Sequence, residues 1–184
     1  MTAIQFTLPE WTGELIATDQ RFPDDDARME LVIELSRRNI ALGTGGPFGA
    51  AVFDAEGRVI ALGVNRVVPE RCSVAHAEMM AYMAAQTALG RPRLNEDGKH
   101  YTLATSAQPC CQCYGATIWA GIDTLLIGAR SEDVMRLTEF DEGPLPADWI
   151  GELNARGIEV RRDLRREEAC EVLAAYSTAG GTHY

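Results

Sequence analysis

Two short segments of the sequence carry side chains that could bind a metal ion and move protons. The first is His76-Ala77-Glu78, and the second is Pro109-Cys110-Cys111-Gln112-Cys113. Cys110 and Cys113 stand three residues apart, and residues at this spacing share one face of a helix. Two cysteines and one imidazole form the ligand set of a catalytic zinc site, because three protein ligands leave the fourth tetrahedral position for water. We therefore expect His76, Cys110 and Cys113 to hold Zn²⁺.

Glu78 is the second chemically useful side chain of the first segment. A catalytic zinc lowers the pKa of its water to about 7, and a carboxylate ligand would displace that water. The better role for Glu78 is as a base toward the water and an acid toward a leaving amine. Residues two apart share no face in the middle of a helix, so we expect His76 and Glu78 in a first turn. The metal should then lie just beyond two helix N-termini.

Other interpretations of the cysteine cluster remain open at this point. Cys111 could replace either neighbouring cysteine as a ligand, although its position one step round the helix points it elsewhere. A structural zinc site would need a fourth cysteine or histidine, and His100 and His183 have no ligand-like neighbours in the sequence. A redox-active dithiol would leave both His76 and Glu78 without a role.

Composition and charge narrow the class of protein and of substrate. The 184 residues are 46% hydrophobic, which predicts a single domain over 1–184, with an irregular arm at 1–23 and a loop insert at 143–157. The net charge of −10 argues against a nucleic-acid partner, which would need a basic surface, and favours a small neutral substrate. No apolar run is long enough to span a membrane, and the N-terminus lacks a basic segment, so we expect a cytoplasmic protein.

Hydrophobic periodicity and turn residues predict alternating helices and strands. Helices are expected over 27–42, 75–89, 110–120, 131–136 and 165–177, and strands in a hairpin over 48–65 and over 101–105, 124–129 and 158–161. This order predicts an α/β protein with one mixed sheet between layers of helices. The helices at 75–89 and 110–120 should direct their N-termini at one edge of the sheet, where α/β proteins usually place their sites.

The spacing of the two segments resembles the zinc-dependent cytidine-deaminase-like superfamily, in which His-x-Glu precedes Pro-Cys-x-x-Cys. The resemblance covers roughly residues 27–130, including the order of strands and helices around the motifs. It implies a three-layer α/β/α fold with a mixed five-stranded sheet. It also implies attack of hydroxide on an amidine-like carbon, with loss of ammonia.

Within this superfamily the chain is most similar to bacterial guanine deaminases. The matching pieces are Gly45–Gly49, Asn65, Ala75–Glu78, Thr105-Ser106 leading into Pro109-Cys110, and Phe140-Asp141-Glu142. The resemblance implies that Phe48 stacks on a base and that Asn65 binds it, with Ala77 in the same substrate site. It places a second carboxylate at Asp141 or Glu142. It also implies a homodimer, in which an aromatic residue such as Tyr184 or Tyr176, often from a swapped partner chain, covers the pocket.

The chemistry of the base supports guanine independently of the resemblance. Guanine presents N1–H and a 2-amino group, which are both donors, so the site that recognises it needs an acceptor. A carboxylate such as Glu142 can accept from both and can relay a proton as the amine departs. Cytosine and adenine present a ring acceptor beside the amine, which a carboxylate would repel. The expected reaction is hydrolysis of guanine to xanthine and ammonia, with Glu78, Glu142 and Asp141 as the catalytic carboxylates.

Each substrate residue also has an ordinary structural interpretation. Phe48 could belong to the core, Asn65 could close a turn, and Asp141-Glu142 could form an acidic surface turn. Guanosine, a pterin, an aminotriazine such as ammeline, and cytosine therefore remain alternative substrates. A tRNA adenosine deaminase and a structural zinc module that binds a partner are further alternatives.

Overall fold

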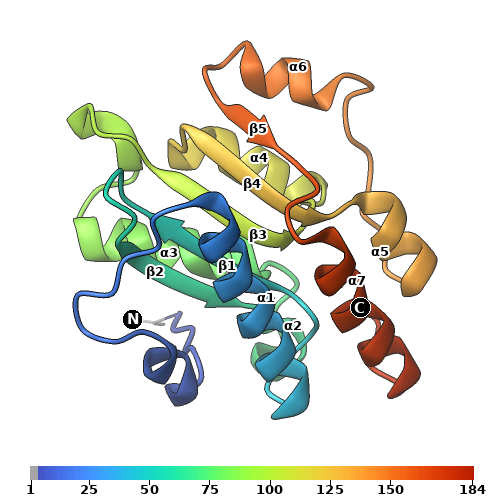
Figure 1. The fold of residues 1–184 in the computed structure, drawn as a ribbon. Coiled ribbons are helices and arrows are strands. Elements are labelled where there is room, and N and C mark those ends of the chain that lie inside the picture. Colours follow the sequence, from blue (N-terminus) through green and yellow to red (C-terminus); the bar gives the residue numbers. More distant parts are fainter. Residues whose placement is uncertain (1–3) are drawn as a thin grey trace.

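A computed structural model describes residues 4–184, and a mixed five-stranded sheet forms its centre (Figure 1). The sheet order is β2-β1-β3-β4-β5, with β1 antiparallel to β2 and β3, and β4 parallel to β3 and β5. The strands are β1 (Gly49–Phe53), β2 (Val59–Val64), β3 (Thr102–Ala107), β4 (Thr124–Ala129) and β5 (Glu159–Arg161). The five-stranded mixed sheet expected from the sequence is confirmed.

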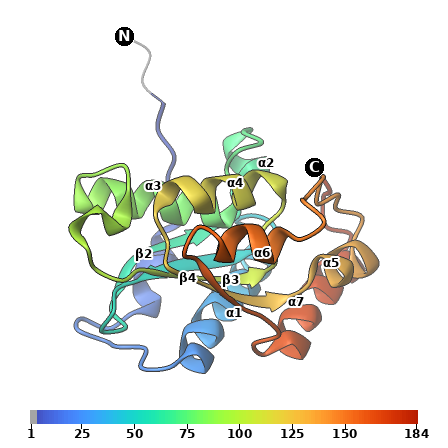
Figure 2. The ribbon, with the colours of Figure 1, turned by 90° about the horizontal axis from the view of Figure 1, so that it is seen from above.

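Helices cover both faces of the sheet, so the fold has the expected three α/β/α layers (Figure 2). On one face lie α1 (Asp25–Ala41), α5 (Ser131–Leu137) and α7 (Arg166–Thr178), and on the other lie α3 (Ala77–Leu89), α4 (Cys111–Ala120) and α6 (Trp149–Asn154). Three shorter elements are α2 (Val67–Glu70) and the 3₁₀ helices η1 (Glu10–Leu15) and η2 (Leu94–Asp97). Within residues 4–184, no helix has both the length and the apolar character needed to cross a membrane.

Each face of the sheet has its own apolar core, because successive side chains of a strand point to opposite faces. In β1, Ala51 and Phe53 pack with α1 and α7, whereas Ala50 and Val52 pack with α3 and α4. Phe53 is fully buried, and burying a side chain of this size stabilises the fold by about 1.5–3 kcal/mol. The sheet is therefore anchored from both sides.

The ends of the long helices follow the signals seen in the sequence. At the start of α1 the Asp24 carboxylate accepts a hydrogen bond from the backbone N–H of Ala27, at 2.8 Å. This cap satisfies one of the N–H groups that a first helical turn leaves unpaired. At the end of α3, Gly90 adopts a left-handed conformation with φ of 66°, which closes the helix as expected.

The antiparallel pairing of β1 places three loops at one edge of the sheet. Because β1 runs opposite to β2 and β3, its start lies beside the ends of both neighbours. Phe48 precedes β1 and Asn65 follows β2, and the Asn65 backbone N–H donates to the Phe48 carbonyl oxygen at 3.1 Å. The segment 108–110 follows β3 at the same edge. This edge is where the candidate site lies.

The structure differs from the sequence expectations in the arm, the insert and the start of α4. The arm at 1–23 is expected to be irregular, but its described part contains η1. The insert at 143–157 contains α6, which the Asp148 side chain caps by accepting from Gly151 N–H at 2.9 Å. Helices this short carry too few residues for a periodic pattern. Pro109 lies before the cap residue of α4 and not in its first turn.

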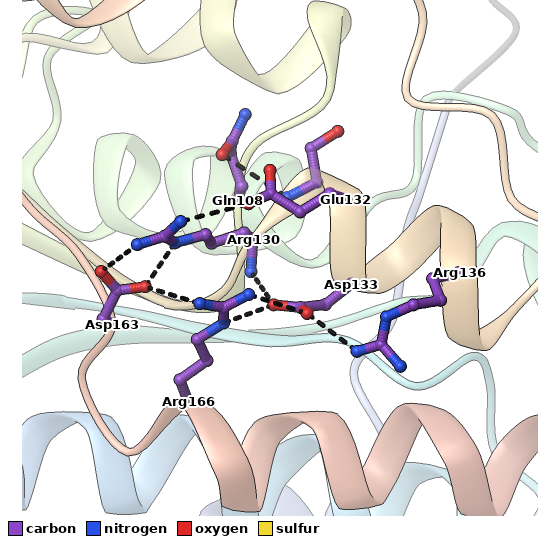
Figure 3. Close-up of polar contacts among 8 residues, drawn as sticks. Gln108, Arg130, Glu132, Asp133, Arg136, Asp163 and Arg166 are labelled. Carbon is purple, nitrogen blue, oxygen red and sulfur yellow. Dashed lines mark hydrogen bonds and ion pairs between the residues drawn. The ribbon is translucent and has the colours of Figure 1, made fainter.

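An ion-pair network joins α5 to α7 (Figure 3). The buried Asp133 carboxylate on α5 accepts from the Arg166 guanidinium of α7 at 2.6 and 2.9 Å and from Arg136 at 3.0 Å. The Arg166 guanidinium holds the pKa of Asp133 well below its usual range. An arginine at the start of α7 is therefore paired with a buried acid on α5.

Replacing Asp133 by asparagine should lower the free energy of unfolding by about 2–3 kcal/mol at pH 7, because Arg166 loses its buried partner charge. The folded-state pKa of Asp133 lies below the unfolded value of about 3.9. The stabilisation is then complete above the unfolded pKa and is lost as the pH falls toward the folded pKa. Urea unfolding of both proteins should give a constant difference above about pH 5 and a shrinking one below about pH 4. The matched control, Glu132→Gln at an exposed neighbouring carboxylate, should change stability by less than about 0.5 kcal/mol; an equal loss in both variants would contradict the prediction.

Candidate active site

The three proposed metal ligands meet where two helices begin. His76 is the cap residue at the N-terminus of α3, and Cys110 is the cap residue at the N-terminus of α4. The Nδ1 atom of His76 lies 3.5 Å from Cys110 Sγ and 3.6 Å from Cys113 Sγ. Across residues 4–184, no other group of three or more histidine, cysteine or acidic residues is placed to hold a metal ion.

The spacing of these atoms fits a tetrahedral zinc ion. Zinc bonds of about 2.1 Å to nitrogen and about 2.3 Å to sulfur, at a tetrahedral angle, put the two ligand atoms about 3.6 Å apart. The two nitrogen–sulfur distances of 3.5 and 3.6 Å agree with this value. His76, Cys110 and Cys113 therefore form a zinc-binding set of three ligands, and Nδ1 is the nitrogen of His76 that faces the cysteines.

The electrostatics of the cluster favour an ionised cysteine. Contacts with the Cys113 side chain and with the His76 imidazole lower the pKa of the Cys110 thiol to about 4. The thiolate is the form of cysteine that binds metals. Cys110 is therefore ready to act as a ligand at neutral pH.

Cys111 is separated from the ligand set by its direction. It is exposed at the start of α4, and its Sγ lies toward Gly143, where an added Cβ would approach it to 2.5 Å. Cys110 and Cys113 contact His76 instead. The geometry therefore leaves Cys111 outside the cluster.

Glu78 lies in the first turn of α3, as expected, and is only 6% exposed. Burial raises the pKa of its carboxyl group, because a charged carboxylate loses solvation away from water. The side chain lines the pocket beside the ligand set but is not part of it. The Glu78 carboxyl group is therefore placed to exchange a proton with a molecule bound in the pocket.

A pocket opens directly above the three ligands. Two of the ligands, His76 and Cys110, line it, together with Phe48, Asn65, Ala77, Glu78, Asp141, Glu142 and Tyr184. The structure thus brings together all the residues expected from the sequence, with Cys113 buried behind them. Two further lining residues, Gln108 and Phe140, were not predicted as site residues. Gln108 stands two residues before Cys110 in the sequence, which is the signal that could have identified it.

Aromatic rings form one wall of this pocket. The ring of Phe140 lies 5.3 Å from that of Phe48 and 4.8 Å from that of Tyr184, measured between centroids. Tyr176 stacks on Phe140 at 6.1 Å and donates a hydrogen bond to the Thr182 carbonyl oxygen, so it supports the C-terminal tail from behind. Of the two tyrosines considered from the sequence, Tyr184 lines the pocket.

The two neighbouring carboxylates at 141–142 differ in their surroundings. Glu142 is 8% exposed and lines the pocket, and burial raises the pKa of its carboxyl group to about 8. Its backbone oxygen accepts from Cys111 N–H at 2.9 Å, which ties this segment to the start of α4. Asp141 is exposed, and its carboxylate accepts from Gly143 N–H at 2.9 Å. Asp141 therefore shapes the turn that carries Glu142.

Asn65 presents a defined polar group to the pocket. Its Oδ1 accepts from the backbone N–H of Val67 at 3.2 Å, which orients the side-chain amide. Among residues 4–184, the Nδ2 group donates to no protein acceptor, and Asn65 lines the pocket. The site therefore offers a donor from Asn65 and an acceptor from Glu142.

Comparison with a protein-family model places the site in a known context. The family described as the cytidine and deoxycytidylate deaminase zinc-binding region matches residues 23–129, which is more than half of the chain. The matched span contains the three zinc ligands and Glu78.

Individual relatives show the same likeness. The chain is 33% identical over 105 residues to a guanine deaminase of Bacillus subtilis, covering 57% of this chain and 64% of that protein, which is slightly less than two thirds of its length. A solved guanine deaminase of Nitrosomonas europaea superposes with a TM-score of 0.90 at 46% identity, covering 96% of this chain and 97% of that one. The protein NE0047 in complex with 2,6-diaminopurine superposes with a TM-score of 0.92 at 46% identity, covering 99% and 96%.

Removing a zinc ligand should remove the metal, whereas changing the neighbouring cysteine should not. Cys113→Ala is expected to lower the zinc content of the purified protein from about one ion per chain to less than about 0.2, because two ligands cannot complete the site. Cys111→Ser, one residue after Cys110, is the matched control and should keep a full zinc content. Metal analysis by mass spectrometry checks both variants; loss of zinc in Cys111→Ser would contradict the assigned ligands.

Proposed function

This chain belongs to the cytidine and deoxycytidylate deaminase zinc-binding family, and from that membership we propose that it hydrolyses guanine to xanthine and ammonia. The observation that carries the proposal is the buried Glu142 carboxylate, which faces the same pocket as the zinc ligands and Glu78. Solved relatives at 46% identity support it, since one is a guanine deaminase and another holds 2,6-diaminopurine. A mutant of the same NE0047 protein is known in complex with 8-azaguanine, a guanine analogue.

The donor and acceptor groups of the pocket suit guanine. The Glu142 carboxylate can accept from N1–H and from the 2-amino group, and Asn65 Nδ2 can donate to a ring acceptor. The aromatic wall of Phe48 and Phe140 offers a surface on which a flat base can stack, a contact worth about 1–3 kcal/mol. Ala77 is fully buried and leaves room for the base beside the metal ligands.

The reaction needs a proton carrier between water and the leaving amine. Zinc supplies a water of lowered pKa when it is bound to His76, Cys110 and Cys113. Glu78 takes the proton of the attacking water on its carboxylate and delivers it to the purine, so that the C2 amino group leaves as ammonia. Glu142 holds the ring N–H and relays a proton while the amine departs. Burial of both carboxylates raises their pKa values toward the range in which such transfers are efficient.

The surroundings of the pocket favour a free base over a polymer. Tyr184 covers the pocket, and the net charge of −10 offers no basic surface for phosphates. We accordingly treat the chain as one deaminase domain over 1–184 whose substrate is a small molecule. The substrate test below distinguishes guanine from the alternative heterocyclic substrates.

A panel of aminated heterocycles tests the substrate. The purified zinc protein should release ammonia from guanine at least about tenfold faster, as kcat/KM, than from guanosine, ammeline, a pterin or cytosine. Ammeline and cytosine change the groups that face Glu142, whereas guanosine adds a sugar and a pterin has a larger second ring, which the pocket must also accommodate. Ammonia release measured by a coupled assay, and xanthine identified by mass spectrometry, check the result. Good turnover of another base with none of guanine would end the proposal.

Three carboxylate-to-amide variants then test the roles within the site. Glu78→Gln should keep its zinc and lose about 10²–10⁴-fold in kcat, since the amide carries no proton. Glu142→Gln should lower kcat/KM for guanine by at least about tenfold. Asp141→Asn is the matched control, because its amide oxygen still accepts from Gly143 N–H, and we expect a loss below about threefold. Equal losses at Asp141 and Glu142 would overturn the assignment of Glu142 as the carboxylate that recognises the substrate.

We also propose that the chain forms a homodimer, as its relationship to guanine deaminases suggests. Trp119 on α4 is 77% exposed, and large aromatic residues are enriched in protein interfaces. Light scattering after size-exclusion chromatography should give twice the chain mass of 20.1 kDa. Trp119→Arg should shift the protein toward the monomer, whereas Met135→Arg, at a 52% exposed residue on α5, should not. A monomeric mass for the unmodified chain would contradict the proposal.

We also propose a cytoplasmic location, which the site chemistry supports. The zinc ligands need two reduced cysteines, and disulfides rarely form in the reducing cytosol. All five cysteines of the structure are free. Fractionation of cells that produce the protein should recover it with cytoplasmic markers, and recovery from an exported fraction would contradict this location.

A further inference from the structure

Asn39 is a fully buried polar residue near the end of α1, away from the zinc ligands. Its Nδ2 donates to the carbonyl oxygen of Gly46 at 2.8 Å and to that of Asn65 at 2.9 Å. Its Oδ1 accepts from the Thr44 hydroxyl at 2.8 Å. Both amide donors and the amide acceptor are therefore satisfied, and the two carbonyl partners fix which side of the amide is nitrogen.

The two carbonyl partners belong to the segments that form one wall of the pocket. Gly46 lies two residues before Phe48, and Asn65 itself lines the pocket. The segments are in close contact, since an added Cβ at Gly45 would lie 1.8 Å from the Asn65 carbonyl oxygen and 2.6 Å from Asn39 Nδ2. One buried amide thus joins the loop before β1 to the loop after β2.

Thr44 extends this connection to the N-terminal arm. Its hydroxyl oxygen accepts from the indole N–H of Trp11 at 3.2 Å while donating to Asn39. Trp11 lies in η1 and packs against the core. The Arg66 guanidinium also donates to the Thr44 carbonyl oxygen, and the Arg66 backbone N–H donates to the Ala75 oxygen at 2.8 Å, one residue before the His76 ligand. A continuous chain of hydrogen bonds therefore runs from the arm to the pocket wall.

We propose that Asn39 is a positioning residue for the substrate site, and that Thr44 and Trp11 connect the N-terminal arm to it. This inference rests on the proposed function and adds a role for the arm, which the family model does not cover at Trp11. Asn39 holds the Asn65 backbone at a fixed distance from the loop before Phe48. Asn65 Nδ2 and the Phe48 ring can then both contact the same bound base. Loss of this link should weaken substrate binding while the zinc site, which lies on α3 and α4, stays intact.

Thr44→Val tests the link with little change of shape. Valine has the size of threonine but removes the hydroxyl that contacts both Asn39 and Trp11. We expect KM for guanine to rise about three- to tenfold, the effect of roughly one hydrogen bond, with kcat changed by less than about twofold and zinc content unchanged. Trp11→Phe, which keeps a ring but removes the indole N–H, should raise KM in the same direction by a smaller factor.

Ser36→Ala is the matched control. Ser36 is fully buried on the same helix, and its hydroxyl donates to the Ile33 carbonyl oxygen at 2.7 Å without contacting either loop. This variant should lower the melting temperature as much as Thr44→Val does but leave KM unchanged. A KM in Thr44→Val equal to that of the unmodified protein, with a similar loss of stability in both variants, would show that the Asn39 cluster is only structural.

Hydrogen–deuterium exchange separates failure of this inference from failure of the proposed function. In the absence of substrate, Thr44→Val should increase exchange at least about threefold in peptides covering 44–49 and 63–67, whereas Ser36→Ala should not. Unchanged exchange in these peptides would overturn the positioning role whichever base the enzyme uses. Lack of guanine turnover by the unmodified protein would instead overturn the substrate assignment, and the exchange result would still decide the role of Asn39.

Discussion

The N-termini of α3 and α4 meet at one edge of the sheet, and the rest of the site depends on this meeting. His76 Nδ1 lies 3.5 Å from Cys110 Sγ because each residue is the cap of its own helix. A cap residue has a non-helical backbone, so its side chain can reach beyond the helix end toward the other helix. Glu78 and Cys113 follow one turn or less into each helix. The zinc ligands and Glu78, the proposed proton carrier, are thus held at two helix starts.

Several buried polar side chains, which are uncommon in an apolar core, lie at this edge of the sheet. Glu78 and Glu142 are each less than a tenth exposed, and Asn39 is fully buried. Burying such groups costs free energy unless they find partners or serve chemistry. Asn39 is fully hydrogen-bonded and holds two loops together, whereas the two carboxylates face the pocket with raised pKa values. Asn39 therefore supports the loops of the site, whereas Glu78 and Glu142 are the groups proposed to act on the substrate.

Glu142 lies in a segment that leaves α5 and returns to the start of α4. Asp133 and Arg166 anchor α5 to α7, and the segment after α5 then returns to α4, where the Glu142 backbone oxygen accepts from Cys111 N–H. Gly143, with φ of 66°, permits this approach, because a Cβ there would clash with Cys111 Sγ. The C-terminal tail packs on Phe140 of the same segment and brings Tyr184 over the pocket. The segment that carries Glu142 and the tail that carries Tyr184 are therefore supported by α5 and α7. These helices cover the face of the sheet opposite to α3 and α4.

The sequence by itself determined the parts whose information is local. The Cys-x-x-Cys and His-x-Glu spacings, the Asp24 cap and the Gly90 stop act over three or four residues, so the zinc ligands and the helix order could be predicted from them. Only the tertiary structure decided that Glu142 is buried while Asp141 is exposed, and that Tyr184 and not Tyr176 lines the pocket, because burial depends on residues far apart in the chain. The same is true of Gln108, Phe140 and the network of Asn39, Thr44 and Trp11. Within the network the indole of Trp11 and the hydroxyl of Thr44 are 33 residues apart in the sequence, and contacts at such separations leave no periodic or spacing signal.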